Sequence, residues 1–173
     1  MKGTPRKSSS RSSTPKNATI RARGAAPGRR ASNSPRAVLP TSPVLDAGLP
    51  RLLGIRLLTL TKKKITAEMP IKPMHLNRTG RVAGGAIMSF ADVLGAVGAV
   101  LHRPHGYRGG TIESKSNFFA AGTGPALRAV TIPLHVGRTT SVWQTTVRNE
   151  DGGLVAVVTQ TQIALPHAKE EQS

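Results

Sequence analysis

The segment NRTGRVAGGAIMSFADVLGAVGAVL, residues 77–101, passes from a glycine-containing loop into a long apolar run and predicts the central element of the fold. Residues 84–101 are too long and too uniformly apolar for a half-exposed strand, which favours a helix. A membrane span needs about 20 mainly apolar residues, whereas this run is shorter and contains Asp92. We therefore expect a buried central helix, against which another element packs closely at Gly95 and Gly98.

Short segments with strand character flank this helix on both sides. They are rich in β-branched residues and leucine, and polar or glycine-containing turns separate them. Pro133 cannot donate to a strand ladder, so its strand is expected to be bulged or to lie at an edge. The order β-β-α-β-β-β-β predicts an α+β protein with one long helix and an antiparallel sheet. The strand segments are 54–60, 64–71, 110–120, 126–136, 139–148 and 153–165.

Composition limits the size of the domain and its chemistry. A chain of 173 residues with 38% hydrophobic content is expected to bury a single core. Cysteine is absent, which excludes disulfides, thiolate zinc sites and cysteine nucleophiles. Hydroxyls, carboxylates, amides, histidines and backbone groups remain available for catalysis, and we expect no metal site.

The net charge of +17 is concentrated in an N-terminal tail. Residues 1–40 hold ten of the 25 Lys and Arg and no acid, which leaves 15 basic against 8 acidic groups elsewhere. Few large apolar side chains occur there, so we expect a disordered tail over residues 1–45, a folded domain over 46–166 and a C-terminal tail over 167–173. The basic tail is an inert extension, an organellar targeting segment, or a weak electrostatic tether to nucleic acid or membrane.

The position of the protein in the cell is predicted only by default. The tail lacks the apolar core of a secretory signal, and we expect no membrane span, so the cytoplasm is the default expectation. No aromatic residue interleaves with the charges of the tail, which gives no support to specific binding of nucleic acid by base stacking.

The chain resembles the hotdog-fold acyl-CoA thioesterases of the phenylacetic-acid-pathway type. The resemblance rests on the element order, on Asn-x-x-Gly-x-x-x-Gly-Gly at 77–85, on Asp92 seven residues later and on TIESKSNFF at 111–119. It covers roughly residues 50–166 and implies an antiparallel sheet wrapped around one long helix. It also implies hydrolysis of an acyl-CoA thioester to a free acid and coenzyme A, without a cofactor other than the coenzyme A of the substrate.

The glycine pair at the expected start of the helix is the first candidate site feature. Helix N-termini present unpaired backbone N–H groups and a partial positive charge, which suit an oxyanion. By resemblance, the N–H of Gly85 polarises the thioester carbonyl, and Gly84 is a second candidate donor. The alternative is that the two glycines only make a tight turn into the helix.

Asp92 is the candidate catalytic carboxylate. It follows Gly85 by almost two helical turns, which places both residues on one helix face and predicts that they address one cleft. A carboxylate among apolar neighbours is costly to bury without a partner, so it is a candidate for acid-base or nucleophilic work. By resemblance, Asp92 attacks the thioester carbonyl or activates a water, and both routes stay open. The alternative is an aspartate that faces solvent or a subunit partner.

Two further residues acquire roles from the resemblance. Asn77 matches a residue that orients the water or the thioester, and Thr111 falls where relatives place a hydroxyl from the other subunit near the nucleophile. Turn chemistry and an ordinary strand start are the respective alternatives. Many members have a histidine directly before the glycine pair, whereas this chain has Ala83.

The expected partners are acyl-CoA and a second copy of the chain. Basic residues at a cleft mouth attract phosphates, and the resemblance implies a homodimer or a homotetramer with the site between subunits. Ala83 slightly favours a rival, a catalytically weak hotdog module that binds acyl-CoA or an acyl carrier in a regulatory or structural role. The sequence does not select an acyl group. The candidate coenzyme A ligands are Arg81, Arg103, Arg108 and Arg138.

Overall fold

The structure is a computed structural model that describes residues 45–167. The predicted tails, apart from residues 45 and 167, lie outside this range. The described chain begins with helix α1 (Gly48–Leu53) and strand β1 (Arg56–Leu60). The remaining elements are β2 (Ile65–Pro70), the 3-10 helix η2 (Pro73–His75), α2 (Gly84–His102), β3 (Tyr107–Phe118), β4 (Ala126–Val136), β5 (Thr140–Asn149) and β6 (Leu154–Pro166).

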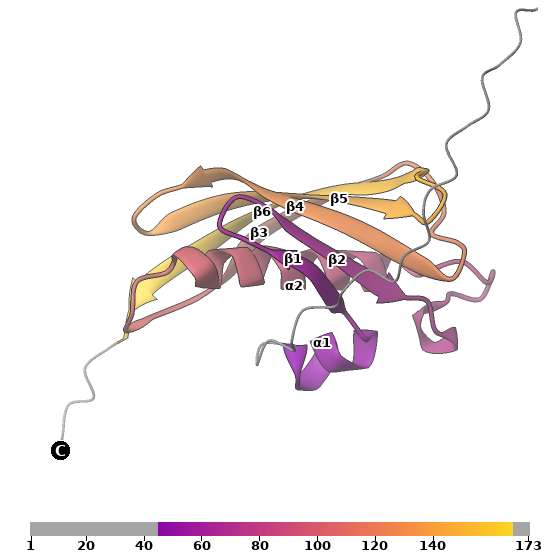
Figure 1. Cartoon of the computed structure of the whole chain (residues 1–173), viewed down its shortest axis with the longest axis horizontal. Helices are drawn as coiled ribbons and strands as arrows, with labels where there is room; N and C mark the ends of the chain where they lie inside the picture. Colours follow the sequence, from indigo (N-terminus) through magenta and orange to yellow (C-terminus); the bar gives the residue numbers. More distant parts are fainter. Residues whose placement is uncertain (1–44, 168–173) are drawn as a thin grey trace, which may run out of the picture. The chain divides into compact units, whose positions relative to one another are not determined.

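The six strands form one antiparallel sheet in the order β1-β2-β4-β5-β6-β3. Figure 1 shows α2 lying along one face of this sheet, with α1 beside it. The predicted class and element order are therefore confirmed. β4 is an interior strand with a register shift between Pro133 and His135, so Pro133 is accommodated by a bulge, as expected of a residue without an N–H.

The side of α2 that faces the sheet is packed tightly. It buries Phe90 and Leu94 completely. A Cβ added to Gly95 would collide with Oε1 of Gln160, and one added to Gly98 would lie 2.7 Å from the Trp143 ring. The prediction of close packing at both glycines is confirmed. By length and apolar composition α2 would qualify as a membrane span, but this face is covered by the sheet.

Residues 48–53 were not predicted from the sequence to form a helix. They form α1, in which Pro50 occupies the first turn, where a backbone N–H has no helical partner to lose. Gly54 ends the helix with φ of 69°, and its N–H donates to Arg51 O. A left-handed residue at this position is a common helix stop that glycine adopts without steric cost.

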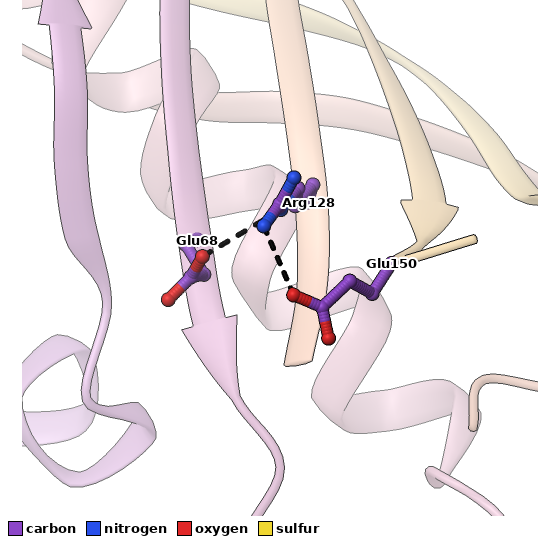
Figure 2. A network of polar contacts seen from close by, with 3 residues as sticks. All are labelled: Glu68, Arg128 and Glu150. Atoms are coloured by element: carbon purple, nitrogen blue, oxygen red, sulfur yellow. Dashed lines mark hydrogen bonds and ion pairs between the residues drawn. The ribbon is translucent and has the colours of Figure 1, made fainter. Parts of the chain in front are cut away.

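The outer face of the sheet carries an ionic network (Figure 2). Nη2 of Arg128 donates to Glu150 at 3.0 Å, and its Nε lies 3.6 Å from Glu68. These contacts connect β2, β4 and the turn after β5 on the side away from α2. Because the three side chains are partly exposed, the network stabilises the sheet only weakly.

Candidate functional site

The two sides of α2 differ in how far the chain covers them. The open face of α2 is defined by Gly85, Met88, Asp92, Ala96 and Ala99, which recur every three or four residues and are exposed or half-buried. This spacing keeps them on one side of the helix. Asp92 is therefore the single charged side chain of a face that otherwise holds small or flexible residues.

The carboxylate of Asp92 is fixed by two hydrogen bonds to one oxygen. Oδ1 accepts from Oγ1 of Thr111 at 2.7 Å and from Nε2 of Gln160 at 2.7 Å. Nε2 of Gln162 donates to the same Thr111 hydroxyl at 2.7 Å. Because this amide nitrogen is only a donor, the Thr111 hydroxyl accepts there and directs its own hydrogen to Asp92. Asp92 is thus not the unpaired carboxylate that the sequence suggested.

Asp92 lies in a pocket of about 270 Å³, here called the Asp92 pocket. Its walls come from the C-terminal half of α2, from β3 and β6, and from the β4–β5 hairpin. Two of the four predicted coenzyme A ligands, Arg103 and Arg138, line it, whereas Arg81 and Arg108 do not. The lining that concerns the chemistry comprises Asp92, Thr111, Gln162, Arg103, Arg138 and Ser141.

Thr111 reaches Asp92 within one chain, so the expectation that this hydroxyl comes from the other subunit is wrong for this contact. The cause is the sheet register. β3 pairs with β6 so that Thr111 lies opposite Gln162, and α2 crosses the same edge of the sheet. Three elements that are distant in sequence therefore meet at the carboxylate.

Gly84 and Gly85 form the N-terminus of α2, as predicted. Their N–H groups have no helical partner, and the preceding Ala83 makes no side-chain cap. Both glycines are exposed, but neither lines the Asp92 pocket. The seven residues from Gly85 to Asp92 rise about 10 Å along the helix. The shared face is confirmed, whereas the single cleft within one chain is not found, because this distance is too long.

Asn77 lies in the turn before α2. Its Oδ1 accepts from the backbone N–H of Thr79 at 2.9 Å, from the Thr79 hydroxyl at 2.7 Å and from the N–H of Arg81 at 3.2 Å. Gly80 completes this turn with φ of 73°. The side-chain oxygen is thus occupied by turn chemistry, and Asn77 does not line the Asp92 pocket.

His75 supports the turn that leads into α2. It is buried, its Nδ1 accepts from the N–H of Lys72 at 3.2 Å, and its carbonyl accepts from the N–H of Ala83 at 2.8 Å. Its Nε2 is buried without a partner among residues 45–167. Burial holds the pKa of His75 below its ordinary value, and the nearby charge of Lys72 lowers this pKa further. His75 therefore has a structural place in this turn.

The sequence-based interpretation missed Gln160 and Gln162. Both are buried, with exposed fractions of 0% and 2%. They follow Ala156 and Val158 on the side of β6 that faces α2. An amide on the inward side of an otherwise apolar strand is costly without a partner. The glutamines of the segment VVTQTQ therefore indicated a buried polar partner, and this signal was available in the sequence.

Asp92 also borders a second, more open pocket of about 220 Å³ on its other side. Leu49 from α1, Met88, Ser89 and Val93 from α2, and Ser114 from β3 complete its lining. The carboxylate therefore stands between a pocket with arginines in its wall and a more apolar one.

Comparison with known proteins relates part of the chain to one family. Residues 79–156, which include both the glycine pair and Asp92, match the thioesterase superfamily. The matched segment is similar to the thioesterase superfamily, and it lies within the hotdog-like arrangement of helix and sheet described above. Among its relatives is a Vibrio cholerae protein named provisionally as an esterase, which is 27% identical over 121 residues, or 70% of this chain and 80% of the relative. The family and such names support hydrolysis of thioesters.

Solved structures of thioesterases share the fold. A mutant thioesterase from Pseudomonas aeruginosa has a TM-score of 0.64 and 28% identity over 67% of this chain and 84% of its own. A hypothetical thioesterase from Streptococcus pneumoniae, solved with coenzyme A, has a TM-score of 0.60 and 22% identity over 66% of this chain and 88% of its own. The hotdog arrangement is thereby confirmed, while the narrower phenylacetic-acid-pathway type stays a prediction.

Proposed function

We propose that this protein hydrolyses acyl-CoA thioesters to a free acid and coenzyme A. The observation that carries the proposal is a carboxylate whose Oδ1 is held by Thr111 and Gln160 at a pocket with Arg103 and Arg138 in its lining. One oxygen of Asp92 is committed to these donors. The other, Oδ2, receives no side-chain hydrogen bond from residues 45–167, which leaves it for the reacting centre.

Two reaction routes use this oxygen. In the first, Oδ2 removes a proton from water while the water oxygen attacks the thioester carbonyl; the tetrahedral intermediate then breaks its C–S bond, and the departing coenzyme A thiolate takes up a proton. In the second, Oδ2 itself attacks, the thiolate of coenzyme A departs, and water then hydrolyses the acyl-aspartate anhydride. Both routes put negative charge on the carbonyl oxygen, and an N–H donor at the α2 N-terminus, Gly85 first and Gly84 second, is suited to stabilise it. Neither route requires a cofactor.

The length of α2 argues for a site shared by two chains. Donor and attacking group must both lie about 3 Å from the same reacting centre, whereas about 10 Å of helix separates Gly85 from Asp92 in one chain. In a homodimer whose open faces of α2 oppose each other, Gly85 of one chain can approach Asp92 of the other. We therefore propose a homodimer as the smallest active unit, and a tetramer would contain two such pairs.

The edge strand β3 gives this dimer a means of assembly. It is 12 residues long, ends the sheet and is exposed along most of its length. Ile112 on this strand has 58% of its surface exposed. An unpaired strand of this length is a template for another strand. Pairing of two β3 strands would cover it and extend the sheet across both chains.

The basic wall of the Asp92 pocket suits the phosphates of coenzyme A. Arg103 ends the helix on the pocket side and Arg138 occupies the β4–β5 hairpin, so two guanidinium groups can bind phosphate oxygens at one opening. The streptococcal structure that shares this fold was solved with coenzyme A, which makes this carrier the first to test. We further propose that the protein acts in the cytoplasm.

The first experiment measures thiol release from a panel of aromatic, short, medium and long acyl-CoAs by wild type and by Asp92→Ala. Since the chain has no cysteine, every detected thiol comes from coenzyme A. We expect a fall of about a hundredfold or more with Asp92→Ala, as for loss of a general base or nucleophile. Asp151→Ala, which removes a carboxylate from the β5–β6 turn, is the control and should retain activity. Tight binding of acyl-CoA without any Asp92-dependent release would favour the rival, a binding module.

The second experiment tests the oxyanion donor and the shared site together. Gly85→Pro removes the N–H in the first helical turn, where proline is tolerated. The matched control Gly85→Ala keeps the N–H and adds a Cβ to open space. We expect Gly85→Pro to abolish activity and Gly85→Ala, which keeps the N–H donor, to lose much less. Mixing it with Asp92→Ala should restore about a quarter of wild-type activity, since half the dimers would be mixed and each would contain one intact site. No recovery after confirmed subunit exchange would exclude the shared site.

A further inference from the structure

We infer that Gln160 is a positioning residue that sets the orientation of the Asp92 carboxylate, and that Gly95 supplies the space in which its amide lies. This inference rests on the proposed function of Asp92. Gln160 comes from β6, 68 residues away from Asp92, and it has no exposed surface. Its amide is thus held by the protein interior rather than by solvent.

The hydrogen-bonding pattern shows which group determines the amide orientation. Nε2 donates to Asp92 at 2.7 Å, whereas Oε1 is buried without a partner among the described residues. An unsatisfied buried acceptor costs about 1–3 kcal/mol. The opposite amide orientation would direct Oε1 at a carboxylate oxygen, and two acceptors repel each other. The bond to Asp92 therefore outweighs the cost of the unpaired oxygen.

Gly95 is the reason why this amide fits against α2. It lies three residues after Asp92, and any Cβ at this position would collide with Oε1 of Gln160. A side chain at position 95 would push the amide away and lengthen its bond to Asp92. The glycine thus costs some helix propensity and permits the contact that fixes the carboxylate.

The consequence concerns the direction in which the reactive oxygen points. Gln160 and Thr111 bind the same oxygen, Oδ1, from two strands, β6 and β3. Two donors on one oxygen restrict rotation of the carboxylate and leave Oδ2 without either of them. A displacement of about 1 Å at a reacting group can cost about a hundredfold in rate, so loss of the Gln160 donor is expected to act mainly on kcat.

The test compares Gln160→Met with Gln160→Glu. Methionine fills nearly the same volume without a donor, and we expect kcat to fall by about tenfold to a hundredfold with little change in KM. In Gln160→Glu, two carboxyl groups share one proton at low pH, which restores a donor to Asp92. The ratio of its activity to that of Gln160→Met should therefore rise as the pH falls from 8 to 5. A residue with only a structural role would give a constant ratio.

Thr145→Val and Gly98→Ala serve as controls, and Gly95→Ala tests the inference without a change at Gln160. Thr145→Val breaks the buried Thr131–Thr145 hydroxyl contact of 2.8 Å and should lower the melting temperature without changing kcat of the folded enzyme. Gly95→Ala should lower kcat with position 160 unchanged. Gly98→Ala, the same substitution one turn later, meets Trp143 instead and should affect stability alone. If Gln160→Met does not fold, the two glycine variants still test the inference.

The outcomes separate this inference from the proposed function. If Asp92→Ala abolishes turnover while Gln160→Met and Gly95→Ala keep kcat within twofold of wild type, the positioning role is excluded and the role of Asp92 stands. If Asp92→Ala retains turnover, the proposed role of Asp92 fails at the first step. Selective loss of kcat in both variants, with the pH-dependent ratio, supports the inference.

Discussion

The two sides of α2 carry glycines for different reasons. On the side facing the sheet, Gly95 and Gly98 allow Gln160 and Trp143 to approach the helix closely. At the N-terminus of the open face, no atom lies within contact distance of a Cβ placed on Gly85. The first pair is explained by packing, whereas Gly85 has no packing explanation within one chain. An unexplained glycine on an uncovered face therefore indicates either a ligand or a second chain.

The largest effect is expected from breaking the packed side. Phe90 is fully buried, whereas Val100 near the other end of the same helix is 40% exposed. Phe90→Ala should lower the free energy of unfolding by about 3–5 kcal/mol, and Val100→Ala by less than about 1 kcal/mol. Urea unfolding at fixed protein concentration measures both. Equal losses would contradict this and would mean that Val100 is covered in solution.

The second largest effect is a loss of stability at low pH, caused by His75 in the turn that leads into α2. The pKa of His75 is lower in the folded protein than in the unfolded chain, so the unfolded state binds more protons in the interval between the two values. The free energy of unfolding should therefore fall as the pH drops below about 6.5, the ordinary pKa of histidine. The stability that neutral His75 contributes is fully present above that pH and is lost as the pH falls below it.

His75→Gln tests the pH effect, because glutamine offers an acceptor but does not titrate. Chemical unfolding at pH 7.5, 6.5 and 5.5 should show a smaller loss of stability in the variant than in wild type across this interval. Parallel curves for the two proteins would show that His75 does not cause the loss.

The smallest effect is expected far from α2, in the network of Figure 2. Glu150→Gln removes the charge that pairs with Arg128 at 3.0 Å. Exposed pairs of this kind contribute about 0.2–1 kcal/mol, and the loss should shrink further in 1 M salt because screening weakens the pair. Thermal melts at low and high salt measure this. A loss larger than that of Val100→Ala would show that the outer sheet face matters more to stability than the open face of α2.

Local patterns in the sequence predicted the main elements of the fold well. The helix at 84–101 and the strand at 126–136 agree with the observed Gly84–His102 and Ala126–Val136, because an apolar run and an alternation are properties of neighbouring residues. α1 was missed because it is a segment of only six residues that contains Pro50, although proline in the first turn is compatible with a helix.

The site was predicted only as far as local spacing allowed. Asp92 was singled out by its spacing from Gly85, and Thr111 only by the family resemblance. Gln160 and Gln162 could not be assigned to Asp92, because their contacts depend on the pairing of β3 with β6, which joins segments about 50 residues apart. Likewise, the spacing of Gly85 and Asp92 correctly predicted a common helix face. It did not take into account that the two residues of one chain lie too far apart to act on one reacting centre.

The long edge of β3 has a consequence for how the protein behaves when it is damaged or diluted. A chain that cannot cover this strand exposes a template of 12 residues, with Ile112 and Phe118 among its exposed side chains. Such an edge invites aggregation. Substitutions that prevent assembly should therefore appear as insoluble protein and low yield rather than as a stable, inactive monomer, and the folded state should become more heat-resistant as the protein concentration rises.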